Sequence, residues 1–252
     1  MKLAIIGAAG RSGSHLLRQA VADGHEVRAF ARSGEAVRRA APDVNRRSYE
    51  VHAVDLRQVH DLRNRLSGCE AVINAAGNAA RIEGYADFVG GIAHEVATAL
   101  PEGGRFWLYG GAAALDIPHT TRMTTELPFI PRAFDAHGRV YRIVRYLPLD
   151  WSMLCVGPMT DHEQTRPRRD LILSTTTWPV VQRRWTRFAP SMMLAATFRQ
   201  SLPRMTVGYA DAARVVLDHL EPSGPLARSR VGLALPNRKR GVKPDAFRVR
   251  RA

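Results

Sequence analysis

The sequence predicts an α/β fold, a doubly wound parallel sheet with helices on both of its faces. Three observations lead to this prediction. Short apolar runs that suit buried strands alternate with helical patterns along most of the 252 residues. The connections between them are short, as in right-handed βαβ units. The first apolar run also passes directly into a glycine-rich turn and a helix, with the spacing Gly7-x-x-Gly10-x-x-Gly13.

The first half of the chain contains four segments with an apolar or alternating pattern, which is typical of strands. These strands are expected at residues 3–6, 25–31, 51–55 and 71–77. Helical patterns lie between and after them. The first helix follows the glycine turn and ends at Gly24, and an arginine-rich helical segment is broken by Pro42. Further helices are expected at residues 59–66 and 85–100.

The second half continues the alternation with fewer elements. Strands are expected at residues 105–111 and 151–156, and helices at 139–146 and 209–220. Residues 1–235 are therefore expected to form a single domain, followed by a basic and mobile tail at 236–252.

Residues 160–206 do not follow the alternation. Aromatic and methionine side chains lie there among arginines and prolines, including Trp178, Trp185 and Phe188. We interpret this segment as a substrate lid or an insertion. Two alternatives remain: its apolar residues fill the core or an oligomer contact, or it forms a membrane-surface helix, which the prolines disfavour.

The net charge of +14 raises the question of nucleic-acid binding. The excess lies mainly in residues 166–204, which hold eight arginines and one acidic residue, and in 228–251, which hold nine basic residues and one acidic residue. In the region with the glycine turn, the numbers of basic and acidic residues are closer to equal. Because a charge run is usually a solvated face or attracts an anionic ligand, we expect no nucleic-acid partner.

Other classes are excluded by what the sequence lacks. No apolar stretch approaches the roughly 20 residues needed to span a bilayer, and the N-terminus does not resemble a signal peptide. Cys69 and Cys155 are far apart and belong to no metal-binding pattern. We therefore expect a cytoplasmic protein without a metal or a disulfide.

The glycine turn is suited to a dinucleotide pyrophosphate. It presents free backbone N–H groups and the positive end of a helix dipole to one point. Gly7 is expected to permit the turn, Gly10 to permit the close approach of a phosphate, and Gly13 to permit close packing of the helix on the strand.

Arg32 and Ser33, after the second strand, indicate which dinucleotide binds. A carboxylate there would favour NAD, whereas an arginine offers a planar cation to the 2′-phosphate of NADP, and Ser33 adds a donor. NADP(H) is therefore expected over NAD(H). Arg11 is a second candidate for the 2′-phosphate; for both arginines the alternative is simple exposure to solvent.

Other expected cofactor contacts follow the later strands. Asp55 would accept a hydrogen bond from the adenine amino group beside Leu56, or else cap a helix. Small side chains at the next strand end would let the dinucleotide lie across it, and glycines would border the nicotinamide. The complete expected set is Gly7, Gly10, Arg11, Ser12, Gly13, Arg32, Ser33, Asp55, Leu56, Ala75, Ala76, Gly77, Gly110, Gly111 and Pro158.

In their order along the chain, these motifs resemble the extended and atypical short-chain dehydrogenase/reductases, especially their NAD(P)H-binding, NmrA-like and flavin-reductase-like branch. The resemblance rests on the glycine turn, Arg32, Asp55-Leu56, 74–77, 109–115, 149–154 with Gly157-Pro158, and 208–211. It covers residues 1 to about 160 and 206–235, and it implies a Rossmann-like fold. It also implies that Asp211 begins a helix beside the substrate region, most simply as its N-cap.

The same comparison reveals a missing catalytic set. Typical members carry a serine after the fifth strand and a Tyr-x-x-x-Lys on the next helix, in which the lysine lowers the tyrosine pKa. Here residues 110–115 hold no hydroxyl group, and no lysine lies between Lys2 and Lys239. The remaining candidates for an acid are Tyr141, which precedes Arg145 by four residues, and His119 and His137.

We therefore expect an NADPH-dependent oxidoreductase that transfers hydride to a small planar or conjugated acceptor, such as a flavin, a quinone or an enone. Such acceptors are themselves electron sinks and make weaker demands on a protein acid. An anionic group on the substrate is an option, and the protein is expected to be a monomer or homodimer. The main alternative is a non-catalytic NAD(P)-binding redox sensor of the NmrA-like type. An isomerase or epimerase is a third option.

Overall fold

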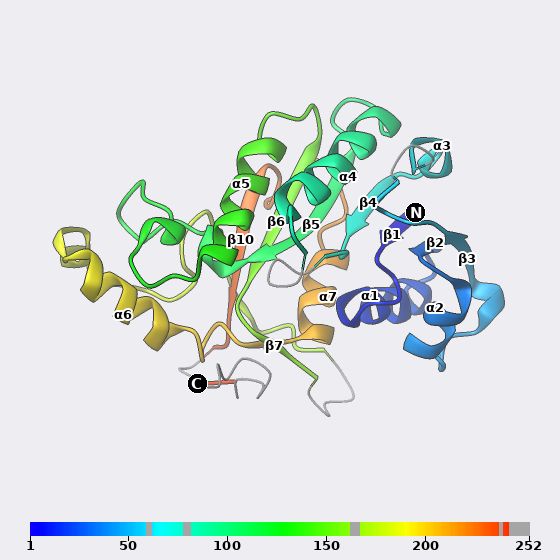
Figure 1. The fold of residues 1–252 in the computed structure, drawn as a ribbon. Coiled ribbons are helices and arrows are strands. Elements are labelled where there is room, and N and C mark those ends of the chain that lie inside the picture. Colours follow the sequence, from blue (N-terminus) through cyan, green and yellow to red (C-terminus); the bar gives the residue numbers. More distant parts are fainter. Residues whose placement is uncertain (59–61, 78–81, 162–166, 237–238, 242–252) are drawn as a thin grey trace.

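A central sheet of eight strands organises the molecule (Figure 1). The computed structural model describes residues 1–58, 62–77, 82–161, 167–236 and 239–241. The strand order is β3-β2-β1-β4-β5-β6-β10-β8, and every strand is parallel to its neighbours except the edge strand β8. The sheet strands are β1 (Lys2–Ile6), β2 (Glu26–Ala31), β3 (Tyr49–Ala53), β4 (Ala71–Asn74), β5 (Arg105–Gly111), β6 (Asp150–Val156), β8 (Ile172–Thr175) and β10 (Ser229–Ala234).

Helices cover both faces of the sheet (Figure 1), as the alternating pattern predicts. One face carries α3 (Leu62–Leu66), α4 (Tyr85–Ala99) and α5 (Asp135–Val144), and the other carries α1 (Arg11–Ala22), α2 (Gly34–Ala40) and α7 (Tyr209–Leu217). Successive strand residues point to opposite faces. In β1, for example, Leu3 and Ile5 join the core under α1 and α7, whereas Ala4 and Ile6 join the core under α4 and α5.

The strand order reverses between β1 and β4. From β1 the chain builds outwards through β2 and β3, and from β4 it builds in the other direction through β5 and β6. This is the doubly wound Rossmann-like arrangement, whose ligand crevice lies beyond the carboxyl ends of the strands at the reversal. The fold predicted from the sequence is thus confirmed.

Several boundaries differ from the predicted ones. The third strand is Tyr49–Ala53 rather than 51–55, because Tyr49 is buried and paired with Val27. The fourth stops at Asn74, whose side-chain oxygen accepts a hydrogen bond from the Ala76 N–H and starts a turn. The helix predicted at 139–146 is Asp135–Val144. The start of the helix predicted at 59–66 and most of the predicted tail lie outside the described residues.

The segment at 160–206 contributes to the sheet and also extends from it. It begins with β7 (Met159–Thr160), which pairs with β9 (Val207–Gly208), and it contains β8, the 3-10 helix η6 (Arg184–Phe188) and α6 (Ser191–Ser201). Trp178 is buried, packs 5.2 Å from the Phe198 ring and donates a hydrogen bond to the Thr124 hydroxyl at 2.6 Å. This side chain therefore belongs to the core, which is one of the alternatives that the sequence leaves open for the segment.

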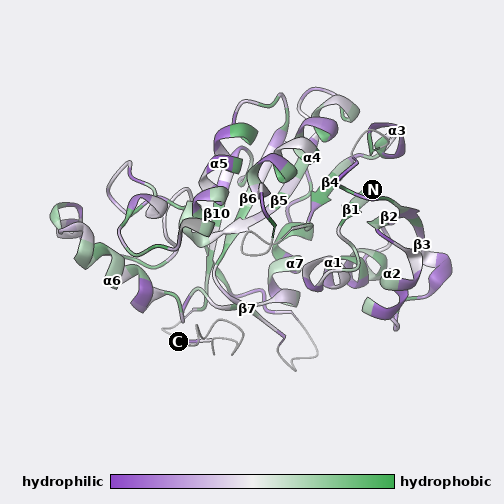
Figure 2. Cartoon of the chain, viewed as in Figure 1, coloured by the Kyte–Doolittle hydropathy of each residue, from purple (hydrophilic) through white to green (hydrophobic). Residues whose placement is uncertain are grey.

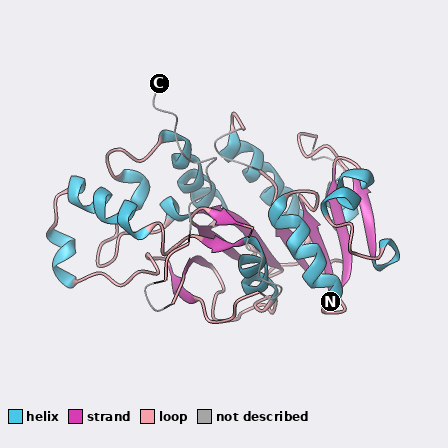
Figure 3. Ribbon diagram, turned by 90° about the horizontal axis from the view of Figure 1, so that it is seen from below, coloured by secondary structure: helices cyan, strands magenta, loops and turns pink. Residues whose placement is uncertain are grey.

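The far part of this segment projects from the molecule. Figures 1 and 3 show α6 extending beyond the sheet at the end opposite β3. Figure 2 shows hydrophobic turns along α6 despite this position. Across the described residues, no helix combines the length and the apolar character that crossing a membrane requires.

Candidate functional site

The turn after β1 has the geometry that its glycines predict. Gly7 has a φ of +85°, and a Cβ atom placed there would lie 2.8 Å from the backbone of Ala76. The N–H groups of Gly7 and Ala8 both donate to the Phe30 carbonyl, at 2.9 and 3.1 Å. The turn is thus fixed between β2 and the end of β4, where only a residue without a side chain fits.

The N-terminus of α1 is open. Gly10 is the N-cap residue, no described side chain caps it, and the first turn holds no acidic residue. A Cβ on Gly13 would collide with the Gly7 carbonyl oxygen, so this glycine brings α1 against the turn. The N–H groups of Arg11, Ser12 and Gly13 belong to the first turn, where an α-helix has no internal acceptor for them. This arrangement favours an anion.

Arg32 and Ser33 lie immediately after β2 and are both exposed. The Ser33 oxygen accepts a hydrogen bond from the Ala36 N–H at 3.2 Å and caps α2. Capping uses a lone pair of the hydroxyl and leaves its proton as a donor. The exposed guanidinium of Arg32 is the cationic group beside this hydroxyl, at the position where a ribose 2′-substituent is expected.

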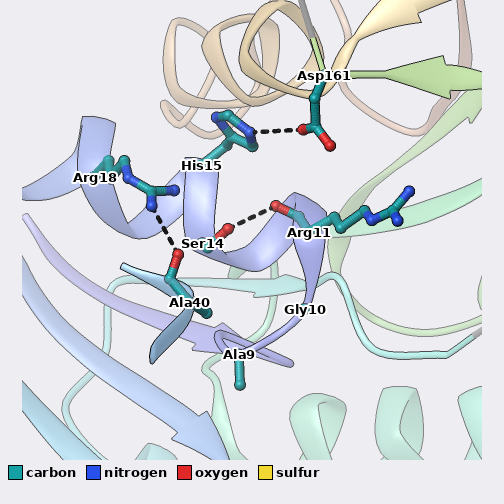
Figure 4. A pocket seen from close by; sticks show the side chains of 8 residues that line it. All are labelled: Ala9, Gly10, Arg11, Ser14, His15, Arg18, Ala40 and Asp161. Atoms are coloured by element: carbon teal, nitrogen blue, oxygen red, sulfur yellow. Dashed lines mark hydrogen bonds and ion pairs between the residues drawn. The ribbon is translucent and has the colours of Figure 1, made fainter. Parts of the chain in front are cut away.

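Arg11 extends to a different place. Its guanidinium lies 6.0 Å from the centroid of the Tyr209 ring on α7, and a hydrogen bond to the Tyr209 side chain raises the pKa of Arg11. Figure 4 shows its side chain pointing away from Arg18 and Ala40, which lie on the α2 side of α1. Arg32 is therefore better placed than Arg11 for a group at the end of β2.

An open pocket of about 340 Å³ runs along the outer face of α1 (Figure 4). Two of its side chains already have partners: His15 lies 3.3 Å from Asp161, and Arg18 pairs with Asp43 at 2.7 Å and donates to the Ala40 carbonyl. The pocket adjoins the glycine turn through Ala9 and Gly10.

The segments that follow β3 and β4 lie at the same carboxyl edge of the parallel sheet as the glycine turn. Asp55 accepts a hydrogen bond from the Arg57 N–H at 3.0 Å, and Leu56 packs against the core. Ala75 and Ala76 are half-buried. Gly77 has a φ of +111°, and a Cβ there would lie 2.8 Å from the Tyr85 ring. The absence of a side chain at Gly77 thus accommodates the Tyr85 ring.

The glycines at the end of β5 accommodate protein side chains. A Cβ on Gly110 would collide with Met153, and one on Gly111 would lie 2.6 Å from Cδ2 of His137. Packing alone therefore explains why both positions are glycine. Their expected place beside a nicotinamide ribose stays a prediction.

His137 is the buried histidine of this region. Its ring lies edge-on to Tyr85 at 5.2 Å between centroids, and stacks 6.2 Å from Phe134. Its Nδ1 atom is buried and has no hydrogen-bond partner in the described part of the chain. Burial lowers the pKa of His137 to about 4, so the imidazole is neutral at pH 7. Burial also raises the pKa of Tyr85 to about 12.

Tyr141 is packed between cations. The guanidinium groups of Arg230 and Arg145 lie 4.1 and 5.5 Å from its ring centroid, and Trp151 packs against it edge-on. Arg230 is itself held by Asp116, with nitrogen–oxygen distances of 2.9 and 2.8 Å. The ring therefore serves as a packing surface for Arg230, an arrangement that no spacing in the sequence indicates.

His119 lies elsewhere, exposed in the loop after β5 with a φ of +66°. Its Nε2 is 3.3 Å from the Gln182 carbonyl oxygen. Of the three candidate acids, His137 is the one whose ring lies directly against the glycines at the end of β5.

The loop after β6 and the start of α7 complete this edge. Pro158 is half-buried between β6 and β7, and a Cβ on Gly157 would lie 2.7 Å from the Met205 carbonyl oxygen. Asp211 caps α7 from the third helical position rather than from the N-cap, because Gly208 is the N-cap residue. Its carboxylate accepts hydrogen bonds from the N–H groups of Gly208 and Arg168.

The sequence matches a protein family over residues 7–183, and that family is described as NAD(P)H-binding. The match spans the glycine turn and ends before η6. Among curated proteins, none is significantly similar in sequence.

Solved structures share the fold at low sequence identity. A candidate NADH-flavin reductase from Streptococcus pneumoniae is 23% identical, with a TM-score of 0.67 over 93% of this chain and 99% of the other. A candidate epimerase from Bacteroides thetaiotaomicron is 20% identical, with a TM-score of 0.67 over 92% and 96%. A short-chain dehydrogenase/reductase from Veillonella parvula, solved with NADP, is 13% identical, with a TM-score of 0.67 over 96% and 98%.

Proposed function

The chain belongs to the NAD(P)H-binding family, and from that premise we propose that it is an NADPH-dependent oxidoreductase. In this proposal it transfers hydride to a small planar or conjugated acceptor, such as a flavin, a quinone or an enone. It does so without the usual serine, tyrosine and lysine. The observation that carries the proposal is the open glycine turn after β1, at the same edge of the sheet as the ends of β4 and β5.

The residues present fit a dinucleotide. The left-handed Gly7 and the uncapped N-terminus of α1 form a cradle for a pyrophosphate, and substituting Gly7 would fill the space beside Ala76. In the proposed complex, Asp55 and Leu56 hold the adenine, and Ala75, Ala76 and Gly77 border the dinucleotide at the end of β4. Gly110, Gly111 and Pro158 border the nicotinamide end.

The proposed preference for NADPH rests on Arg32. Its exposed guanidinium stands at the end of β2 with a free Ser33 proton beside it, and both suit a 2′-phosphate. No carboxylate occupies the position after β2 that would favour the ribose hydroxyls of NAD.

When bound, the reduced nicotinamide supplies the hydride, and the protein supplies orientation and exclusion of water. His137, against Gly111, is the proposed polar group nearest the reacting centre. Because its pKa of about 4 keeps it neutral, it acts by donating or accepting a hydrogen bond rather than as an imidazolium acid. This limited capacity suits an acceptor that is reduced without a strong acid. Tyr141 and His119 are weaker candidates in the proposed scheme, because Tyr141 is packed against Arg230 and His119 is exposed.

The first test is binding. Calorimetric titration of the protein with NADPH and with NADH should show tighter binding of NADPH. Arg32→Ala should weaken NADPH by about tenfold or more and leave NADH within about twofold, since only NADPH loses a charged partner. Arg38→Ala, an exposed arginine on α2, is the matched control. Tighter binding of NADH by the native protein would refute the assignment.

The second test is turnover. NADPH oxidation is followed at 340 nm with a flavin, a quinone and an enone as acceptors, and we expect turnover with at least one. The lack of a hydroxyl group at residues 110–115 and of the Tyr-x-x-x-Lys pair favours a second candidate, a non-catalytic redox sensor. Tight NADPH binding without turnover on any of the three acceptors would support the sensor and contradict the enzyme.

A further inference from the structure

Five exposed apolar side chains are gathered at one end of the molecule. Val181, Trp185, Phe188, Met192 and Met193 are 93, 50, 76, 61 and 46% exposed. They lie in η6, in the first turn of α6 and in the loop before them, and we call these five residues the apolar tip. Figures 1 and 3 show α6 projecting beyond the sheet at this end. Single exposed apolar residues are ordinary, whereas five within residues 181–193 are unusual, and such a concentration marks an interaction surface.

The surroundings of the apolar tip are cationic. Arg183, Arg184 and Arg187 are all exposed in the same short stretch, and Arg187 lies over the Phe188 ring at 4.5 Å. Residues 171–210 contain five arginines and no acidic residue. Within the described residues, no carboxylate forms a salt bridge with these three arginines.

Buried side chains and hydrogen bonds hold the segment that carries the apolar tip. Thr186 is buried, and its hydroxyl donates to the Arg183 carbonyl at 2.7 Å. At the start of α6, Ser191 accepts a hydrogen bond from Arg122 at 3.2 Å. The Trp178 and Phe198 rings anchor the segment to the core. The exposed side chains therefore stand on a supported base, which lowers the entropy lost when they bind.

The charges indicate the kind of surface that covers the tip. A second copy meeting the same surface would bring arginines against arginines, which electrostatic repulsion opposes. A group of exposed aromatic and methionine side chains with flanking arginines suits an anionic lipid surface. There the apolar groups enter the boundary between headgroups and acyl chains, and the guanidinium groups stay with the phosphates.

We propose that the apolar tip docks the protein on an anionic membrane surface. The three arginines contact lipid phosphates, and Trp185, Phe188 and the methionine pair insert between the headgroups. The tip lies at the opposite end of the molecule from α2 and β3, where Arg32 stands (Figure 1). Docking therefore leaves the dinucleotide site open. The inference goes beyond the proposed oxidoreductase function and does not depend on it.

Vesicle binding tests the proposal with the full chain. Co-sedimentation is compared between vesicles of phosphatidylcholine alone and vesicles that also contain phosphatidylglycerol. We expect binding to the anionic vesicles and its decline as salt is raised. Trp185 supplies an internal probe, because Trp107, Trp151 and Trp178 are at most 3% exposed. Its fluorescence should shift to shorter wavelength on binding.

Two variants separate the apolar and the cationic parts. The double variant Trp185→Ser with Phe188→Ser should weaken binding at least about tenfold, through the loss of aromatic burial. The triple variant Arg183→Gln, Arg184→Gln and Arg187→Gln should weaken it about fivefold per arginine. Two matched controls change other exposed surfaces. One replaces three arginines with glutamine, at Arg46, Arg47 and Arg63. The other places serine at Phe129 and Tyr146. The controls should bind vesicles like the native protein.

Several outcomes would overturn the proposal. One is that the native protein does not bind anionic vesicles. A second is that the tip variants bind them as well as the native protein does. A third is that the control variants lose as much vesicle binding as the tip variants. Tip-dependent capture by immobilised polyglutamate without vesicle binding would indicate an acidic protein partner instead. Self-association in sedimentation that the tip variants abolish would indicate a second copy. NADPH titration of each variant shows independently that the dinucleotide site is intact.

Discussion

At the scale of single residues, His137 combines burial with an unpaired polar atom. Its ring fills the space left by Gly111, contacts Tyr85 and leaves a buried Nδ1 atom without a partner in the described part of the chain. An unpaired buried polar atom costs free energy unless water or a ligand satisfies it. The ring lies against Gly111 at the carboxyl end of β5, the edge of the sheet that holds the proposed dinucleotide site, which is consistent with the proposed role of His137 beside an acceptor.

The lowered pKa of His137 makes stability depend on pH. The unfolded histidine takes up a proton near pH 6.5, whereas the folded one resists protonation down to about pH 4. The unfolded state therefore binds more protons between these values, and stability is complete above pH 6.5 and falls as pH decreases towards 4. The full effect is roughly 3 kcal/mol.

A His137→Gln variant tests this dependence. Its unfolding free energy, measured with denaturant at pH 7 and pH 5, should fall less on acidification than that of the native protein. The native-minus-variant difference should change by roughly 2 kcal/mol between these pH values. His25→Gln is a useful comparison: burial also lowers the pKa of that more exposed histidine, so its native-minus-variant difference should change in the same direction. An unchanged difference for His137→Gln would show that this residue is not buried as a neutral group.

At the scale of elements, the β1–turn–α1 unit combines a folding role and a proposed binding role in neighbouring glycines. Gly13 lies against the Gly7 carbonyl, so any side chain there separates α1 from the turn. Gly10 has ordinary extended angles, with a φ of −80°, and a Cβ there would meet the Gly7 oxygen at 3.2 Å. Packing constrains Gly13, whereas Gly10 is constrained mainly by the proposed approach of a phosphate from outside.

Alanine at these two glycines should therefore have different effects. Gly13→Ala should lower the unfolding free energy by roughly 3 kcal/mol through overpacking. Gly10→Ala should cost less than about 1 kcal/mol but weaken NADPH about tenfold or more, because its methyl group occupies the path of the phosphate. Denaturant unfolding and calorimetric titration measure the two effects. Normal NADPH binding by Gly10→Ala would contradict the proposed position of the pyrophosphate.

The elements also show what the sequence can predict. The strand Arg105–Gly111 is found with the expected bounds, because a continuous apolar run between turns has one simple interpretation. The strand β10 was not predicted, since Arg230 and Gly232 interrupt its pattern. In the structure Arg230 is buried against Asp116 and Tyr141, and Gly232 makes room for Leu115. Such partners lie far away in the sequence and leave no local periodicity.

For the candidate site, the sequence likewise predicts some parts and not others. Its backbone parts follow from glycine spacing, because φ and close packing restrict those positions locally. The contacts of Tyr85 with Gly77 and His137 depend on how α4 and α5 pack together, and no spacing encodes that. Likewise, the exposure of the apolar tip cannot be inferred from its composition, since Trp178 and Trp185 lie seven positions apart, one buried and one exposed.

At the scale of the whole molecule, we expect the two ends of the parallel sheet to have separate roles. The carboxyl ends of β1 to β6 carry the glycine turn, Arg32 and His137. At the opposite ends, the first residues of β5 and β6 form a buried ion pair, with Arg105 Nη1 3.4 Å from Asp150 Oδ1. Burial lowers the pKa of Arg105 to about 10, and two of its nitrogens also donate to the His219 carbonyl.

Breaking this pair should affect folding and leave dinucleotide binding alone. Asp150→Ala leaves the Arg105 charge buried without its carboxylate and removes the acceptor of the Ser223 N–H, so we expect a loss of about 3 kcal/mol in unfolding free energy. Asp150→Asn keeps an oxygen for that N–H and should lose less. For both variants, NADPH affinity at a temperature where they are folded should stay within about twofold of native. This is the converse of Gly10→Ala. A parallel loss of affinity in Asp150→Ala would mean that the two ends of the sheet are coupled, and that stability and binding cannot be assigned to separate ends.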